Sequence, residues 1–357
     1  MPVPPDPKVS PSSELVRRLP PGCFAFVMAT GIVSTGLALV GRTVLSLVLL
    51  AVAVLGGLVL VAGTTWRLVA YRHDVLHDAR NPDRAFGFFT TVAALNVVGV
   101  RLDLAGYPTA GLVLAAASVP IWLLLTYAIP GMLMLGPQTS MQSTAVAAEV
   151  NGSWFLWVVG TQSLATAAAG LGYRQVVPAA AMAPTAVALW GVGVMLYLTL
   201  VSLVTWRLLS TPASPHTLSP AYWIYMGATA ITVLAGARIL TLPADLPIMQ
   251  TTESLVAGLT YVLWAFGTWW IPLLVAFGVW RHLLRSEPIR YEAGLWSIVF
   301  PLGMYAVASL LFGRTQHLAF MEWIGRVEVW VAVLAWVAVM LAMLLAGRKR
   351  DRPRPAQ

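Results

Sequence analysis

The sequence predicts an all-α integral membrane protein whose ten transmembrane helices form five quasi-repeated helical hairpins around a central pore. Three observations predict this fold: the composition, ten apolar runs, and a similar aromatic opening in every second run. Of the 357 residues, 59% are hydrophobic and 10% are charged, whereas a soluble domain carries about 25% charged residues. This much apolar surface requires lipid as the solvent for most of the chain.

The ten apolar runs each have about the 17–25 residues that a membrane-crossing helix needs. An even number of crossings places both termini on the same side of the membrane. We expect the runs at residues 21–41, 44–66, 85–102, 108–129, 152–172, 183–206, 220–241, 255–280, 293–312 and 326–346.

Two tails flank the predicted transmembrane domain, which covers residues 20–346. Residues 1–19 contain five prolines and no signal-peptide pattern, so we expect a disordered tail. Residues 347–357 are basic and interrupted by proline, which predicts a second tail that rests on lipid. The single cysteine, Cys23, excludes a disulfide within the chain.

The distribution of lysine and arginine predicts the orientation. The termini and the loops on their side of the membrane carry 16 such residues, and the opposite loops and helix ends carry 6. By the positive-inside rule both termini are cytoplasmic, as in a multi-pass protein of the plasma (inner) membrane. The net charge of +8 could indicate nucleic acid, but the basic residues flank the membrane and no nucleic-acid-binding module is visible.

The odd-numbered runs open alike, with aromatic residues followed by small residues or threonine. The aligned aromatics are separated by 63, 68, 68 and 75 residues by subtraction, which predicts five hairpins of an odd helix followed by an even one. Aromatics also favour membrane interfaces, so the alternative is a chance alignment. The aligned residues are Phe26, Phe89, Trp157, Tyr225 and Phe300.

Two amides predict which helices are central. Asn96 and Gln162 are the mid-span amides, and both lie in odd-numbered runs. Amides are unfavourable against lipid and face other helices or water. We therefore expect the odd helices to line a central path, whereas the alternative is hydrogen bonding between helices without a path. The residues expected to line the path are Phe26, Phe89, Asn96, Trp157, Gln162 and Tyr225.

Three segments, "PPGCFAFVMATGI", "NGSWFLWVVGTQSLA" and "FPLGMY", resemble the tellurite-resistance/dicarboxylate transporter family over residues 17–346. That family includes bacterial tellurite-resistance proteins, fungal malate and sulfite permeases and the slow anion channels of plant guard cells. The resemblance implies five quasi-symmetric hairpins, odd helices lining a pore, and homotrimers with one pore per subunit. It also implies a phenylalanine in the ninth helix that plugs the pore, and Phe300 matches it. The sequence departs from the family in its kinks, because only Pro301 lies well inside an odd run.

Proline after Phe300 supports a gate at this position. Pro301 removes a helical hydrogen bond, which costs about 3 kcal/mol, and it is expected to kink the helix. The kink would direct Phe300 inward, where its ring can block and dewet the path. The alternative is that Phe300 packs between helices.

The charged residues favour an anion as the transported solute. We expect no Asp or Glu in the middle of a helix, which weakens a model with a buried proton relay. Arg101, Arg238 and Arg314 cluster towards the outer half, and such residues attract anions. The alternative is that Arg238, the deepest, reaches the interface or pairs with a nearby carboxylate.

The sequence therefore predicts a transporter or channel for small anions, not an enzyme. The resemblance favours C4-dicarboxylates such as malate, or oxyanions such as tellurite or sulfite. The alternatives are a membrane enzyme acting on lipid or isoprenoid substrates and a receptor. His73 and His77 have a zinc-compatible spacing but no third ligand, so we expect neither a metal nor a cofactor.

Overall fold

The computed structural model describes residues 11–135, 150–210, 219–288 and 291–350, and every regular element in these ranges is a helix. Each of the ten predicted runs falls on a helical segment. Nine helices of the described residues are long and apolar enough to cross a membrane. The remaining run forms the 3₁₀ turn η4 (Pro220–Tyr222) and the 17-residue α10 (Trp223–Ile239). The chain is a multi-pass membrane protein.

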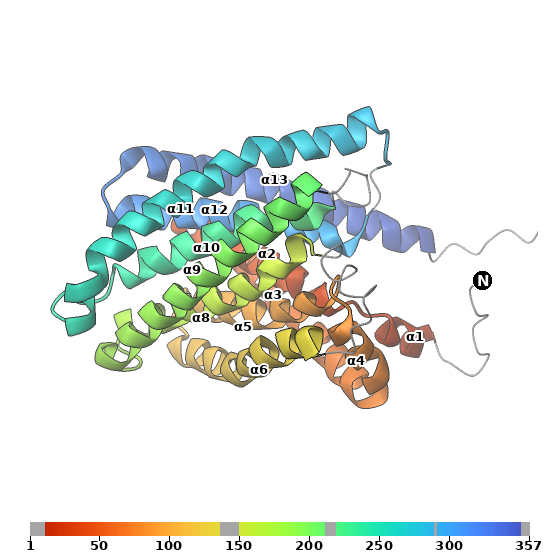
Figure 1. Cartoon of the computed structure of the whole chain (residues 1–357), viewed down its shortest axis with the longest axis horizontal. Coiled ribbons are helices and arrows are strands. Elements are labelled where there is room, and N and C mark those ends of the chain that lie inside the picture. The colour runs from red at the N-terminus through yellow and green to blue at the C-terminus, as the bar shows by residue number, and fades with distance from the viewer. Residues whose placement is uncertain (1–10, 136–149, 211–218, 289–290, 351–357) are drawn as a thin grey trace, which may run out of the picture.

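Five short helices form the centre of the bundle (Figure 1). Each packs against its inner neighbours in chain order, and α12 closes the ring against α2. In four of them, 72% to 83% of the most apolar 18-residue stretch is buried. Almost all residues of α10 are also buried. These inner helices are α2 (Ala25–Leu39), α5 (Phe89–Leu104), α8 (Leu156–Tyr173), α10 and α12 (Trp296–Thr315).

Five longer helices surround the inner ring, and each packs along the inner helix that precedes it. Only 17% to 33% of the most apolar 18-residue stretch of each outer helix is buried. Their exposed leucine, valine and tryptophan side chains are therefore suited to lipid contact. They are α3 (Thr43–Ala70), α6 (Pro108–Leu135), α9 (Ala179–Ser210), α11 (Pro247–Val279), which continues into the π turn η5 (Trp280–Leu284), and α13 (Ala319–Arg350).

A 3₁₀ turn directly precedes each inner helix, and the five turns contact one another in a closed ring. Glycine permits this contact, because a Cβ on Gly87 would lie 2.9 Å from the backbone nitrogen of Gly22. A Cβ on Gly152 would likewise overlap the carbonyl of Ala221. We call this set the 3₁₀ ring; it consists of η1 (Pro21–Phe24), η2 (Ala85–Phe88), η3 (Gly152–Phe155), η4 and η6 (Ala293–Leu295).

The opposite ends of the inner helices finish in a repeated turn. Four of the five turns that join an inner helix to its outer partner contain a residue with positive φ, at Gly41, Gly106, Gln175 and His317. In each of the four, the next N–H donates to the carbonyl five residues earlier, as in a Schellman motif. The donor and acceptor pairs are Arg42–Leu37, Tyr107–Leu102, Val176–Leu171 and Leu318–Gly313.

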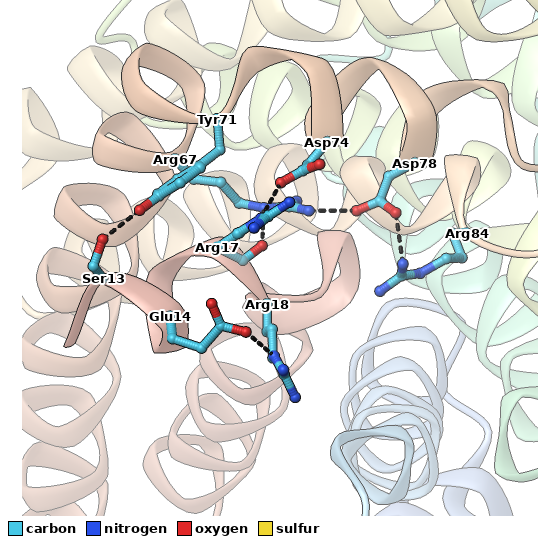
Figure 2. Close-up of polar contacts among 9 residues, drawn as sticks. All are labelled: Ser13, Glu14, Arg17, Arg18, Arg67, Tyr71, Asp74, Asp78 and Arg84. Carbon is cyan, nitrogen blue, oxygen red and sulfur yellow. Dashed lines mark hydrogen bonds and ion pairs between the residues drawn. The ribbon is translucent and has the colours of Figure 1, made fainter. Parts of the chain in front are cut away.

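A buried carboxylate joins several elements beside the 3₁₀ ring (Figure 2). Asp78 of α4 (Arg72–Arg80) accepts from Arg67 of α3 and from Arg84, each at 2.6 Å. The Asp78 and Arg67 side chains are only 2% and 6% exposed. Arg67 also donates to the carbonyl of Arg17, the last residue of α1 (Pro11–Arg17). Asp78 therefore holds α1, α3, α4 and the start of η2 together.

A second ion pair on α4 is exposed. Arg17 donates to Asp74 at 2.7 Å, and this hydrogen bond and the charge of Asp74 raise the pKa of Arg17. Both side chains are more than a third exposed, so the pair contributes little to stability.

The ends of the described chain differ from the predicted tails. Helix α1 forms within residues 1–19, where the prediction is a disordered tail, and α13 continues to Arg350, past the predicted start of the second tail at residue 347. Both α1 and the end of α13 lie at the right-hand end of the bundle in Figure 1. Residues 1–10 and 351–357 lie outside the described residues.

Gly106→Ala tests the repeated turn. Gly106 has φ 93° and nothing within 4 Å of its would-be Cβ, so the substitution acts on the backbone alone. We expect it to destabilise the protein by about 1–2 kcal/mol, measured by thermal unfolding in detergent. Gly170→Ala, in α8 with equally open surroundings, is the matched control and should stabilise by up to about 1 kcal/mol. Equal effects of the two substitutions would contradict a left-handed requirement at the turn.

Asp78→Asn tests the buried cluster. Removing one partner of a buried ion pair costs about 3–5 kcal/mol, and we expect a loss of that order in denaturant unfolding. Asp74→Asn, on the same helix but in the exposed pair, should lose no more than about 1 kcal/mol. A comparable loss for both variants would show that Asp78 is not a structural centre.

Candidate functional site

A narrow cavity lies on the axis of the inner ring, and all five inner helices contribute to its wall. The volume open to the centre of a water molecule is about 20 Å³. One water requires about 10–15 Å³ of such volume. The cavity therefore holds about one water and is too small for a larger solute in this conformation. The wall consists of Ile32 and Thr35 of α2, Asn96, Val97 and Val100 of α5, Ser163 and Thr166 of α8, Ile231, Leu234 and Arg238 of α10, and Met304 and Val307 of α12.

The hydroxyl groups of the wall donate to their own helices. Thr35, Ser163 and Thr166 each donate to a carbonyl three or four residues earlier, at 2.7 to 3.0 Å. These bonds satisfy the protons without breaking the helices. The uncharged wall thus offers few free donors, which suits weak binding and rapid release of an anion.

Arg238 is the one charged residue of the described wall. It lies in the last turn of α10, and its Nε is buried without a hydrogen-bond partner. None of the ion pairs between described residues includes Arg238. Asp103, the acidic residue that interacts electrostatically with Arg238, is paired with Arg174 at 3.3 Å. A partly unsatisfied guanidinium at a water-sized cavity is a candidate contact for an anion.

An apolar collar lies one helical turn from the cavity, towards the 3₁₀ ring. Residues four apart lie above one another on a helix face, so the residues four before the first wall residue of each inner helix form the next layer. This layer contains no polar side chain, and all five of its residues are buried. We call it the collar; it consists of Met28, Val92, Val159, Gly227 and Phe300.

Phe300 has the largest side chain of the collar and is 0% exposed. It shares a face of α12 with Met304 and Val307, which are wall residues. Its burial excludes an orientation into lipid. Phe300 therefore lies on the face of α12 that lines the cavity one turn further along.

Two close contacts fix α12 at this level. A Cβ on Gly227 would lie 2.8 Å from the Cγ of Pro301, so the proline ring packs directly on α10. A Cβ on Gly303 would lie 2.8 Å from a methyl group of Ile32, so α2 approaches the other side. Pro301, the partner of Phe300 in the predicted gate, therefore contacts α10 directly.

The other aromatics expected to line the path contact neighbouring helices. The Phe26 ring lies against Gly56 of α3 and packs edge-on against Trp296 at 5.0 Å. Trp157 donates to Thr126 of α6 at 2.9 Å. None of the aligned aromatics is a wall residue, and their positions range from the first to the fifth residue of their helices.

Phe89 and Tyr225 also pack against neighbouring helices. Phe89 packs between α5 and α8, where a Cβ on Gly160 would lie 2.8 Å from its ring. The Tyr225 hydroxyl lies 2.8 Å from that of Thr205 on α9, and its ring packs on Trp270 of α11 at 4.2 Å. The lining roles of these aromatics remain predictions, and the geometry gives them packing contacts.

The two amides predicted to line the path point in different directions. Asn96 is a wall residue, and its Nδ2 lies 3.0 Å from Ser118 of α6 and 3.1 Å from Ser163 of α8. Gln162 is directed away from the cavity, since it donates to the Trp190 carbonyl of α9 at 3.1 Å and lies over Gly193. Only Asn96 is thus placed to meet a solute.

The other two arginines predicted to attract anions lie behind the wall. Arg101 is 3% exposed and donates to the hydroxyls of Ser34 and Ser46 at 2.7 to 3.1 Å. These two serines donate to each other's carbonyls, so their lone pairs are free to accept from Arg101. Arg314 donates to the Leu39 carbonyl at 3.0 Å and faces Glu322 at 3.7 Å. Neither arginine contacts the cavity, but the charge of Arg101 has no carboxylate partner among the described residues.

One acidic residue lies deeper than the sequence predicts. Because α13 begins at Ala319, Glu328 is the tenth residue of a 32-residue helix and not a residue at its end. The sequence predicts that this run begins at residue 326, which places Glu328 near the end of the helix. His73 and His77 are exposed on α4, and the described residues contain no group of three His, Cys, Asp or Glu that could hold a metal.

Comparison with known proteins gives a family for this bundle. A sequence model of a family described as voltage-dependent anion channel matches residues 18–344. The chain belongs to this family. It is the family that the sequence resembles, and its members are transporters or channels, not enzymes. The match covers all ten predicted runs except the last two residues of the final one.

Two relatives carry less functional information. An uncharacterized membrane protein of Mycobacterium tuberculosis, matched in two strains, is 52% identical over 149 residues, which are 42% of this chain and 75% of that protein. An uncharacterized transporter of Methanocaldococcus jannaschii is 24% identical over 152 residues, 43% of each chain. The first is a membrane protein by name and the second a transporter by name.

Proposed function

We propose that this protein moves small anions across the membrane along the axis of the inner ring. The observation that carries the proposal is the axial cavity, whose wall comes from all five inner helices and whose one charged residue, among those described, is Arg238. The guanidinium of Arg238 forms no ion pair among the described residues, so it repels a cation and attracts an anion. The family supports the same class of solute.

Selection and passage come from different parts of the path. Arg238 raises the local anion concentration at one end of the cavity, and the charge of Arg101 behind the wall adds to the same field. The hydroxyls of the wall, engaged with their own helices, hold an anion only weakly. A solute that is attracted but weakly bound passes on quickly.

Phe300 closes the path in this conformation. The collar is apolar at every helix, so water and ions avoid it when it is narrow. Gly227, which packs on Pro301, has no side chain, and Phe300 has the largest side chain of the collar, so we take the phenyl ring as the main obstruction. The contact of Pro301 with Gly227 positions the backbone that carries the ring, so the gate proposed from the sequence consists of Phe300 with Pro301 as its support.

The substrates that we propose are C4-dicarboxylates such as malate, or oxyanions such as tellurite or sulfite. The small cavity requires the ring to widen before any of them passes. Flux assays with purified protein in liposomes, with chloride, nitrate, malate and sulfite compared, identify the substrate.

We also propose the topology and assembly. The 17-residue α10 is the tenth crossing, since it occupies the place between α8 and α12 in the ring. The repeated 3₁₀ turns and Schellman turns support five quasi-equivalent hairpins. Both termini are cytoplasmic in the plasma (inner) membrane, and the protein is a homotrimer with one path per subunit.

Phe300→Ala tests the constriction. We expect anion flux in liposomes to rise by about tenfold, the effect of lowering a barrier by about 1.4 kcal/mol. Phe312→Ala is the matched control, because Phe312 is a buried phenylalanine of α12 on a different face from the wall residues. Unchanged flux in a folded Phe300→Ala protein would remove the gate.

Arg238→Gln tests the attraction of anions. We expect flux at low ionic strength to fall by about tenfold, since a positive site at a narrow entrance raises on-rates by about 10 to 10³. The fall should diminish at high salt, because salt screens the charge. Arg326→Gln, at a side chain that is 60% exposed, should leave flux unchanged; equal losses in both variants would contradict a special role for Arg238.

A further inference from the structure

Glu328 is an acidic side chain inside a membrane-spanning helix. It lies nine residues after Ala319, the first residue of α13, which corresponds to about 14 Å along the helix. The candidate span covers Ala319–Gly347, longer than the hydrocarbon core of about 30 Å requires. With the excess length shared equally between the two ends of the span, the backbone of Glu328 lies about 7 Å inside the hydrocarbon layer. Ionisable residues at such a depth are functional candidates.

The carboxyl of Glu328 has no hydrogen-bonding partner among the described residues. Its Oε2 is buried and accepts no hydrogen bond, and no ion pair of the described residues includes it. Arg326 is two residues away, on a different side of the helix, and contacts Glu322 at 3.5 Å. An ionised carboxylate without a partner is strongly disfavoured in an apolar medium.

Tyr305, which interacts electrostatically with Glu328, forms its hydroxyl hydrogen bond with Thr268. Thr268 of α11 donates to the Trp264 carbonyl at 2.8 Å, so its oxygen accepts the proton of the Tyr305 hydroxyl at 2.8 Å. Tyr305 of α12 is the titratable residue that interacts electrostatically with Glu328, but its proton is directed to Thr268. It therefore does not stabilise a negative charge on Glu328.

Few other titratable or charged groups lie on the helices packed against α13. Helix α2 has none, and α11 contributes Glu253 and Tyr261, which are exposed. Arg42, directly before α3, lies 5.9 Å from the ring centroid of Trp330 on α13 and forms no ion pair with Glu328. Helix α12 contributes Arg314, which is engaged with Leu39 and Glu322. The proton-bound form of Glu328 is thus the one that fits the observed packing.

The residues around Glu328 pack directly against α12 and α2. Gly325, one turn before Glu328, lies against α12, since its would-be Cβ would be 2.7 Å from the Ala306 carbonyl. Val329, the next residue, packs on Gly36 of α2. Tyr305 follows Phe300 by five residues on α12. A charge on Glu328 would therefore disturb the contact that seats the helix carrying Phe300.

We propose that Glu328 is a proton-binding site within the membrane that controls the seating of α12. With the proton bound, α13 packs on α12 as observed and Phe300 closes the path. When the proton passes to water, the carboxylate favours a conformation in which it is hydrated, α12 shifts, and anion flux rises. The second part of this proposal rests on the proposed function; the proton site itself does not.

The stability of purified protein tests the proton site without any flux assay. We compare thermal unfolding of the wild type and Glu328→Gln from about pH 5 to about pH 9. Because the folded state retains the proton more strongly than the unfolded state, the wild type should lose stability as the pH rises, and Glu328→Gln should not. Glu253→Gln, at an exposed carboxyl of α11, should follow the wild type. Parallel curves for the wild type and Glu328→Gln would overturn the site.

Flux in liposomes tests the control of α12. Wild-type anion flux should rise about fivefold or more with pH, the lower end of typical coupling between two sites, and Glu328→Gln should remain low and independent of pH. A stability difference accompanied by equal pH dependence of flux in the two proteins would overturn the control of α12. Absence of flux in every variant, including Phe300→Ala, would overturn the proposed function and leave the stability result standing.

Discussion

The close packing of five short helices around one axis is the constraint on which the rest of the structure depends. Every backbone polar group in a bilayer must be satisfied within the protein, so the path must be built from helices that touch along their length. Small residues permit this approach: Gly22 meets Gly87, Gly152 meets Ala221, and Gly227 meets Pro301. The long outer helices then need only an apolar surface, which is why they carry most of the exposed leucine and valine.

Most charged side chains in the described bundle form an ion pair or hydrogen bond through at least one atom, as Asp103 and Arg207 do although each also has a buried atom without a partner. Asp78 and Arg67 are paired, and Arg101 is bound by two hydroxyls whose own protons are used elsewhere. Arg238 at the cavity and Glu328 beside α12 differ, because each has a buried atom without a partner and neither belongs to an ion pair of the described residues. Unsatisfied polar groups are unfavourable in lipid. We therefore assign a function to each of these two residues, Arg238 to the anion and Glu328 to the proton.

The sequence predicted the parts of the fold that depend on composition and periodicity. Apolar runs located all ten helical segments, because lipid imposes their length, and Asn96 indicated a polar wall. It did not predict the directions of Phe26, Trp157 and Tyr225, because each opening contains several aromatics and only packing against the outer helices decides which way each one points. Glu328 was misplaced because the start of α13 depends on a Schellman turn at His317 and Leu318, which has no glycine to mark it.

The most direct test of the central claim is the reversal potential of Phe300→Ala protein in planar bilayers under a salt gradient. If the axial path conducts anions past Arg238, the current should reverse near the equilibrium potential of the anion. Reversal near the equilibrium potential of the cation, or no current from folded protein, would contradict the claim.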